Sequence, residues 1–197
     1  MRPDRKLILA SRSPRRQHLL RQIGWEFEVR ESGIDEVFPP GADPRAAVAS
    51  LAEQKASAVA PAYADAIILG ADTVVVIDGT VLGKPGSPED ASRMLRLLSG
   101  KTHEVLTGFA LLDRPTNKRA AGVELTRVTF RTLSADEIGE YVSAGSPMDK
   151  AGAYGIQDDR GAVFVERVEG CFYNVVGLPL TRLYVTLRDF QKQLGNL

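Results

Sequence analysis

Short apolar runs alternate along this chain with segments of helical periodicity. The run "KLILA" (6–10) is typical of a buried strand, and "WEFEVRESGIDEVFPPG" (25–41) begins with a strand-like alternation before it becomes a loop. In "AIILGADTVVVIDGTVLGKP" (66–85), the Asp-Gly pair at 78–79 lies between β-branched residues and predicts a hairpin. The remaining expected strands are 103–113, 121–131 with a bulge or bend between Leu125 and Val128, and 162–168.

Helices are expected where a start signal precedes apolar residues spaced three or four apart. The expected starts are Pro14, Asp43 with Pro44, Ser87 with Pro88, and Ser134, and a closing helix contains Leu183, Leu187 and Phe190. Ser134 and Glu137 form a capping box, and Gly24 and Gly100 are expected to end the first and third helices. The segments 147–157 and 170–179 are predicted loops.

The order of these elements favours an α/β fold. Helices and strands alternate irregularly and some neighbouring strands form hairpins, which predicts a mixed twisted sheet flanked by helices. No linker, repeat or low-complexity segment interrupts the 197 residues, so a single domain over 1–197 is expected.

Composition and charge narrow the class of protein. The chain is 44% hydrophobic, and its 25 basic residues balance its 25 acidic ones. This balance creates no overall field toward nucleic acid or an anionic membrane, so an anion site needs a local cluster. No apolar run has the length of a secretory signal or the ~18–20 residues of a membrane span, which predicts a cytoplasmic protein. The single cysteine, Cys171, is interpreted as a packing residue.

The stretch "LILASRSPRRQHLL" is the first candidate for chemistry. It places Arg15 and Arg16 in the first turn of a helix and Arg12 just before it, although a helix N-terminus already carries partial positive charge. A bound phosphate would explain these cations, because backbone N–H groups and the hydroxyls of Ser11 and Ser13 would join them around the anion. The alternative is a solvated helix start with Ser13 as its N-cap.

Two charged residues stand where apolar side chains are expected. Lys55 falls on the apolar stripe of the helix from Asp43, where a lysine usually extends its ammonium to the edge of the core. Alternatively, it reaches a carboxylate or phosphate beneath the helix. Asp72 interrupts a strand that reads as buried on both faces. A buried carboxylate needs a metal ion, a cation or a raised pKa, which makes Asp72 a functional candidate unless it caps backbone in a bulge.

Oxygen atoms are the candidate ligands for a metal ion. Glu36 and Asp72, with Asp35 as a third candidate, suit Mg²⁺ or Mn²⁺. His18 and His103 have neither metal-ligand spacing nor suitable partners for a catalytic triad. His103 is instead expected to support a strand through a hydrogen bond.

Several separate segments of the chain occur together in one known family. In order they are "LASRSPRRQHLL", "GIDE", "AEQKA", "GADTVVV", "LGKP", "LSGKTHEVLTG", "DKAGAYGIQ" and "NVVGLPL". Through them the chain resembles, from end to end, the Maf family, also called septum formation inhibitor-like proteins. The resemblance implies a nucleoside triphosphate pyrophosphatase, which cleaves between the α- and β-phosphates. It also implies a fold related to the inosine-triphosphate pyrophosphatases, with two lobes around a central cleft, a divalent metal ion and a homodimer.

The resemblance also implies roles for individual residues. Asp72 matches the proposed general base, and Glu36 matches a polar residue that lines the cleft. With the oxygen-ligand argument above, Glu36 and Asp72 are the expected metal ligands. The implied substrate-binding residues are Ser11, Arg15, Arg16, Lys55, Thr73, Lys84 and Gln157. Arg12 departs from the family, because many relatives have glycine or another small residue there. Its side chain either narrows the loop or adds a phosphate contact.

The segment "DKAGAYGIQ" resembles the subgroup that acts on dTTP and UTP. The amide of Gln157 both donates and accepts, so it could read the O4 and N3–H edge that thymine and uracil share. The expected function is therefore hydrolysis of dTTP and UTP as nucleotide-pool house-cleaning, with a further role in cell-division arrest. The alternatives are modified pyrimidine triphosphates or 7-methyl-GTP as substrate, or a non-catalytic nucleotide-binding regulator with a cell-division partner. Neither nucleic acid nor a membrane is an expected partner.

Overall fold

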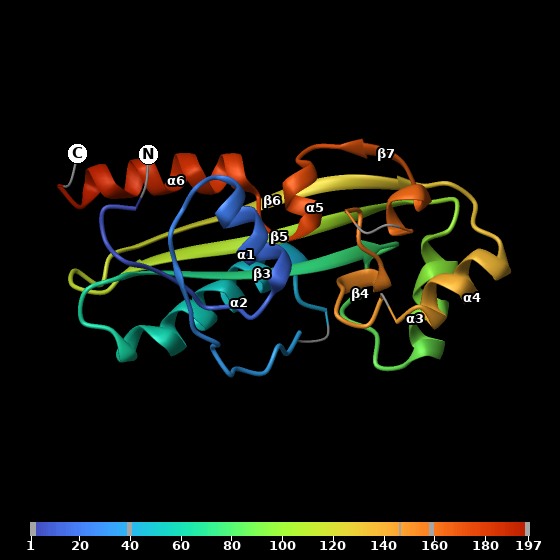
Figure 1. Cartoon of the computed structure of the whole chain (residues 1–197), viewed down its shortest axis with the longest axis horizontal. Helices are drawn as coiled ribbons and strands as arrows, with labels where there is room; N and C mark the ends of the chain where they lie inside the picture. The colour runs from blue at the N-terminus through green and yellow to red at the C-terminus, as the bar shows by residue number, and fades with distance from the viewer. Residues whose placement is uncertain (1–2, 39–40, 146, 158–159, 196–197) are drawn as a thin grey trace. The chain divides into compact units, whose positions relative to one another are not determined.

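The computed structural model describes residues 3–38, 41–145, 147–157 and 160–195 (Figure 1). The chain divides into two compact units. The first comprises Met1–Asp72, Thr107–Glu124 and Gly177–Leu197, and the second comprises Thr73–Leu106 and Leu125–Val176. The strands form one mixed sheet of order β2-β1-β3-β5-β6-β7, with β4 paired to β3. The predicted α/β fold with a mixed sheet and flanking helices is confirmed.

Three long strands contribute residues to both units: β3 (Ile67–Ile77), β5 (Thr102–Asp113) and β6 (Arg119–Phe130). The other elements of the first unit are β1 (Leu7–Leu9), α1 (Pro14–Gln22), β2 (Glu28–Val29), α2 (Pro44–Val59), the 3-10 helix η1 (Ala60–Ala62) and α6 (Leu180–Gln193). The other elements of the second unit are β4 (Thr80–Leu82), α3 (Pro88–Leu98), α4 (Ala135–Ser143), the 3-10 helices η2 (Ala151–Ala153) and η3 (Gly161–Phe164), β7 (Val165–Glu169) and α5 (Phe172–Val176).

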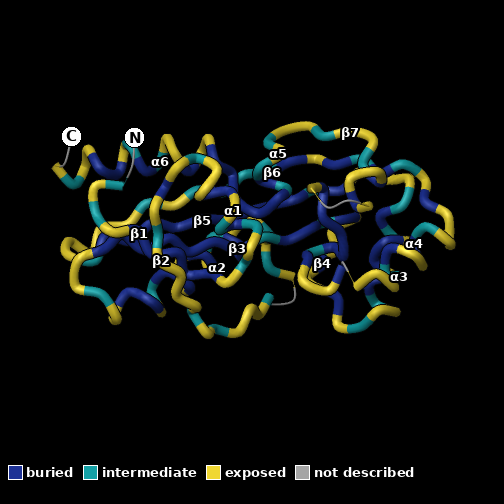
Figure 2. Tube along the Cα trace, viewed as in Figure 1, coloured by how far each residue is buried: buried dark blue, intermediate teal, exposed yellow. Residues whose placement is uncertain are grey.

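The parallel strands form the core of the first unit. β1 pairs in parallel with both β2 and β3, and every residue of β1 is buried. The strand predicted over 6–10 is thus confirmed as a buried strand for Leu7–Leu9, whereas Lys6 lies outside it and is exposed. Figure 2 shows β3 and β5 as mostly dark blue traces, whereas many outward turns of α6 are yellow. A charged side chain in strands as buried as these would be energetically costly without a partner of opposite charge.

Helices α2 and α6 cover opposite faces of the sheet in the first unit (Figure 1). Gly108 of β5 faces α2, because a Cβ at this position would lie 2.4 Å from Val48 O. The next residue, Phe109, faces the other way and contacts Gly122, which also lies near Arg182 of α6. The closing helix buries Leu183, Leu187 and Phe190, as the sequence predicts.

Local signals fixed much of the second unit. The β3–β4 hairpin turns at Asp78 and Gly79, whose φ angles of 49° and 76° are those of a type I′ turn. α3 has Ser87 as its N-cap, and α4 begins with the predicted capping box. Within the described part of the chain, no helix has the length and apolar character needed to cross a membrane.

The structure differs from the predicted elements at the carboxyl side of the second unit. The expected strand 162–168 begins only at Val165, because the residues before it form η3. The predicted loop 170–179 contains the short helix α5. Its Asn174 side chain donates hydrogen bonds to Val105 O and Thr126 Oγ1, both at 2.9 Å, which anchor the segment. In its pairing with β7, β6 has a register shift at Thr129/Phe130, close to the bend or bulge predicted between Leu125 and Val128.

Candidate functional site

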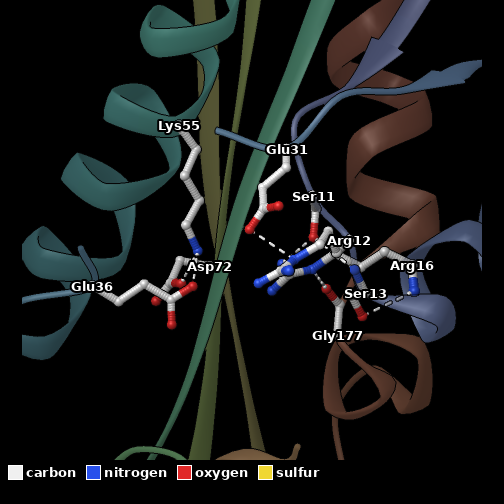
Figure 3. A network of polar contacts seen from close by, with 9 residues as sticks. All are labelled: Ser11, Arg12, Ser13, Arg16, Glu31, Glu36, Lys55, Asp72 and Gly177. Carbon is white, nitrogen blue, oxygen red and sulfur yellow. Dashed lines mark hydrogen bonds and ion pairs between the residues drawn. The ribbon is translucent and has the colours of Figure 1, made fainter. Parts of the chain in front are cut away.

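The amino end of α1 holds a buried arginine. Ser13 caps the helix by accepting from the Arg16 N–H, and Ser11 accepts from the Ser13 N–H at 3.2 Å. The Arg16 side chain turns inward and is 8% exposed. Its Nη1 donates to Ser11 Oγ at 3.1 Å and its Nε donates to the carbonyl oxygen of Gly177 at 2.9 Å (Figure 3). The helix has the expected cap, but this start is not simply solvated.

The other two arginines differ from Arg16 in exposure. Arg15 is half-buried. Arg12 is exposed, and its Nε lies 2.7 Å from Glu31 Oε1 (Figure 3). An exposed ion pair of this kind contributes little to stability, about 0–1 kcal/mol, so Glu31 does not hold Arg12 firmly in place.

A lysine and two carboxylates form the second part of the site. Lys55 Nζ donates to Asp72 Oδ1 and to Glu36 Oε1, each at 2.6 Å (Figure 3). The side chains of Lys55 and Asp72 are 5% and 6% exposed, whereas that of Glu36 is 39% exposed. The interpretation of Lys55 as a lysine at the edge of the core is therefore wrong, and its alternative, a carboxylate beneath the helix, is what the structure shows. A cation partner is also one of the solutions that a buried Asp72 requires.

Glycine at position 70 allows α2 to approach β3 closely. A Cβ at Gly70 would lie 2.0 Å from Ala52 O and 2.8 Å from Ala56 N, so a larger residue would displace the helix. Gly70 and Asp72 lie two residues apart and therefore share one face of the strand. Lys55 is three residues beyond Ala52 and lies on the same side of the helix. The close approach thus brings the Lys55 ammonium within hydrogen-bond reach of Asp72.

The electrostatics of the site balance burial against opposite charge. Burial lowers the pKa of the Arg16 guanidinium, while the negative charges of Asp72 and Glu36 act to raise it and the charge of Arg15 lowers it further. The two halves of the site therefore lie within electrostatic reach of each other, as Figure 3 also shows. Two buried cations, Arg16 and Lys55, and the Asp72 carboxylate thus belong to one site, a combination of groups that suits the hydrolysis of a phosphate compound.

The donor chemistry at this site is compatible with a hard divalent cation. Glu36 and Asp72 offer the carboxylate oxygens that Mg²⁺ and Mn²⁺ prefer. Among the described residues, no group of three or more His, Cys, Asp or Glu side chains could hold a metal ion, so Asp35 does not complete a protein-only cage. The ammonium of Lys55 bridges the two carboxylates.

The remaining predicted site residues belong to the second unit. Thr73 directly follows Asp72 in β3 and is half-buried. Lys84 and Gln157 are both exposed. The structure thus brings together five predicted residues within the first unit, namely Ser11, Arg16, Glu36, Lys55 and Asp72.

Two glycines that shape the site, Gly70 and Gly177, lie in the quoted segments "GADTVVV" and "NVVGLPL", but no role was predicted for either. Gly70 was available as a signal, because an isolated glycine inside a β-branched strand is typical of close backbone approach. Gly177 contributes through its carbonyl oxygen, which any residue type could supply.

The chain matches known proteins over almost its full length. The family model described as Maf-like protein matches residues 6–190. A protein of Pelotomaculum thermopropionicum is 49% identical over 186 residues, which cover 94% of this chain and 97% of the relative. A protein of Moorella thermoacetica is 51% identical, with 94% and 95% covered, and one of Bacillus mycoides is 47% identical, with 98% and 99% covered. All three relatives are named dTTP/UTP pyrophosphatase. These matches show that the chain belongs to the Maf family.

Proposed function

We propose that this protein is a nucleoside triphosphate pyrophosphatase that hydrolyses dTTP and UTP to the monophosphate and pyrophosphate. The three relatives, which are 47–51% identical to this chain, are named dTTP/UTP pyrophosphatase, and this supports the substrate class. The observation that carries the proposal is the network in which Lys55 holds the buried Asp72 beside the buried Arg16. This arrangement combines a proton acceptor with cations for phosphate oxygens.

Asp72 serves as the general base. Its carboxylate takes a proton from the attacking water as the water oxygen bonds to the α-phosphorus and the bridge to the β-phosphate breaks. Pyrophosphate then leaves. Arg15, Arg16 and Lys55 neutralise phosphate oxygens, and Ser11 orients Arg16 through its hydroxyl. Positioning and charge stabilisation provide most of the acceleration in such chemistry, and a general base contributes roughly 10²–10⁴-fold.

Glu36 and Asp72 would hold Mg²⁺ or Mn²⁺, with substrate phosphates completing the ligand set. When bound, such an ion neutralises phosphate charge and lowers the pKa of a coordinated water. Lys55 donates to Oδ1 of Asp72 and to Oε1 of Glu36, and thereby orients the two carboxylates that would hold the ion. Its ammonium also offers a positive charge to a phosphate oxygen.

Three residues of the second unit complete the proposed substrate contacts. Lys84 binds phosphate, and Thr73 and Gln157 select the base, with the Gln157 amide paired to the O4 and N3–H edge. Arg15 also contributes to substrate choice. The proposal includes a single domain with two lobes around a cleft, a cytoplasmic homodimer and a house-cleaning role in nucleotide pools. The alternative is a non-catalytic protein that binds nucleotide and acts through a cell-division partner.

The test is pyrophosphate release from a panel of nucleoside triphosphates, with Mg²⁺ or Mn²⁺ and with a chelator. We expect metal-dependent cleavage of dTTP and UTP and little cleavage of ATP or dGTP. Cleavage centred on 7-methyl-GTP would preserve the mechanism and overturn the role of Gln157. Nucleotide binding without hydrolysis across the panel would favour the regulator instead.

The variant Asp72→Asn tests the general base directly. We expect kcat to fall by about 10²–10⁴-fold while the fold is retained, because the amide oxygen still accepts from Lys55. Asp78→Asn is the matched control, since Asp78 is an exposed aspartate in the β3–β4 turn, where asparagine is readily accommodated. Near-normal activity of Asp72→Asn would remove Asp72 from the role of base.

A further inference from the structure

A buried histidine and tyrosine in the second unit have no part in the mechanism above. His103 and Tyr154 are 1% and 5% exposed, and His103 Nε2 lies 2.8 Å from the Tyr154 hydroxyl. Both rings meet Phe130 edge-on, with centroid distances of 5.0 and 4.7 Å. This aromatic cluster confirms the expectation that His103 forms a supporting hydrogen bond, but its partner lies 51 positions away in the sequence.

The imidazole of His103 is neutral at physiological pH. Burial lowers its pKa to about 4, and burial also raises the pKa of the Tyr154 hydroxyl. Within the described part of the chain, His103 Nδ1 has no hydrogen-bond partner. The contact with Tyr154 is therefore the polar interaction that the structure gives this buried ring. A neutral pair of this kind acts through geometry rather than charge.

Tyr154 belongs to the segment 150–157, whose backbone N–H groups also donate to elements that are distant in the sequence. The Gly152 N–H donates to Gly83 O at 3.0 Å, and the Gly155 N–H donates to the Tyr141 hydroxyl at 3.2 Å. These contacts join the segment to the β4–α3 loop and to α4, while Tyr154 joins it to β5.

The backbone of the segment is also sterically defined. Gly152 has a φ of 69°, and a Cβ there would lie 2.8 Å from Val75 Cγ2 of β3. Ala153 has a φ of 62°, a conformation that residues other than glycine adopt only when their surroundings impose it. The residues around this segment therefore specify one backbone path.

Two proposed substrate residues adjoin this fixed path. Gln157 follows Tyr154 by three positions, and the intervening Ile156 is buried. Lys84 follows Gly83, whose carbonyl oxygen accepts from the segment. A single set of contacts thus supports both the residue proposed to read the base and one proposed to bind phosphate.

We propose that His103 is a positioning residue for base selection: its buried hydrogen bond to Tyr154 fixes the segment 150–157 and thereby the place at which Gln157 meets the base. This inference rests on the proposed function, because it assigns His103 a role in the use of Gln157. His103 itself is buried and acts through Tyr154 rather than on the nucleotide.

The variants Tyr154→Phe and His103→Phe each remove one side of the hydrogen bond. We expect each to raise KM for dTTP and UTP by about 3- to 10-fold, the range of one neutral hydrogen bond, with a smaller change in kcat. The preference for UTP over CTP should narrow. Because both variants remove the same interaction, the double variant should lose no more selectivity than the more affected single variant. His103→Gln, whose amide can still bond the hydroxyl, should restore part of the selectivity.

Thr126→Val is the matched control. Thr126 lies in the same unit and carries a buried hydroxyl that bonds Cys171 and Asn174, not the segment 150–157. Loss of this hydroxyl should lower the free energy of unfolding without changing the preference for UTP over CTP. A selectivity change of equal size in Thr126→Val would overturn the assignment of His103.

Hydrogen exchange of the segment 150–157, followed by mass spectrometry without nucleotide, separates this inference from the proposed function. Exchange should accelerate in Tyr154→Phe and His103→Phe but not in Thr126→Val. If exchange in Tyr154→Phe and His103→Phe is unchanged, the positioning role of His103 is overturned. It is also overturned if exchange is faster but both variants keep the wild-type preference for UTP over CTP. If the wild type hydrolyses no triphosphate, the proposed function fails, and binding of UTP and CTP then measures the selectivity. If the ratio of UTP affinity to CTP affinity is the same for the wild type and the variants, the positioning role of His103 is also overturned.

Discussion

Lys55 Nζ and Asp72 Oδ1 form a 2.6 Å hydrogen bond between two side chains that are both more than nine-tenths buried. The pair joins helix α2 to strand β3 beside Gly70, where a Cβ would lie 2.0 Å from Ala52 O. Buried ion pairs of this kind add little net stability over apolar residues, but loss of one partner is costly. The pair is therefore better explained by chemistry than by stability.

Replacing Lys55 with methionine should destabilise the protein. Lys55→Met leaves Asp72 buried without its cation, and we expect the free energy of unfolding to fall by about 3–5 kcal/mol in urea denaturation. The double variant Lys55→Met/Asp72→Leu should recover most of this loss. Arg93→Met is the control, because Arg93 forms an exposed ion pair with Asp90 and should change stability by less than about 1 kcal/mol. If the double variant were no more stable than Lys55→Met, the unpaired Asp72 carboxylate would not be the cause of the instability.

Metal binding should depend on the same lysine. Without nucleotide, the Lys55 ammonium already pairs with both Glu36 and Asp72, so wild-type protein should bind Mn²⁺ weakly. Lys55→Met should bind Mn²⁺ at least about tenfold more tightly, because a like charge has been removed from the site. Electron paramagnetic resonance of free Mn²⁺ measures this directly. Lys101→Met, which removes an exposed lysine paired with Asp78, should behave like the wild type. Equal affinities of wild type and Lys55→Met would refute the prediction.

A methyl group at position 70 should disturb stability and activity together. In Gly70→Ala the new Cβ would meet Ala52 O at 2.0 Å, so α2 must move away from β3 and carry Lys55 with it. We expect a loss of about 1–3 kcal/mol in unfolding free energy, with a lower kcat. Gly139→Ala is the control, because Gly139 lies inside α4 with nothing within 4 Å of its added Cβ. That variant should be more stable by about 0.5–1 kcal/mol and fully active.

The buried imidazole of His103 should make stability depend on pH. Burial holds its pKa at about 4 in the folded protein, against 6.5 in the unfolded chain. As the pH falls below 6.5 the unfolded chain binds a proton first, so the contribution of His103 to stability is complete above this value. It should be lost between pH 6.5 and about 4, by an amount on the order of 3 kcal/mol. His103→Gln cannot titrate, so the wild-type-minus-variant difference in unfolding free energy should decline across this window. A constant difference would exclude the buried neutral form.

The sequence predicted those features that are determined by neighbouring residues. The Asp78-Gly79 hairpin and the Ser134–Glu137 capping box match the structure, and the strand predicted over 6–10 is present as the buried strand Leu7–Leu9. Each depends on backbone chemistry within a few residues. The need of Asp72 for a partner also follows from its apolar surroundings, because the cost of burial is independent of the partner's identity.

Features that depend on distant contacts were less predictable. The burial of Lys55 results from Gly70 on another element, and a helical stripe alone cannot distinguish this position from the edge of the core. Helix α5 is too short to show a period and is anchored by Asn174 through bonds to two strands. The partnership of His103 with Tyr154 joins β5 to the segment 150–157, and no local signal indicates it.

The division of the chain has a consequence for how this protein can be dissected. Each unit is assembled from separate stretches of sequence, and β3, β5 and β6 each change unit within their length. A cut at any of these boundaries would therefore divide a strand or leave an incomplete set of strands. Neither unit can be expressed as one continuous fragment, and exchange of modules between relatives by simple fusion would break both. Folding must instead close contacts between remote parts of the chain, which favours slow folding.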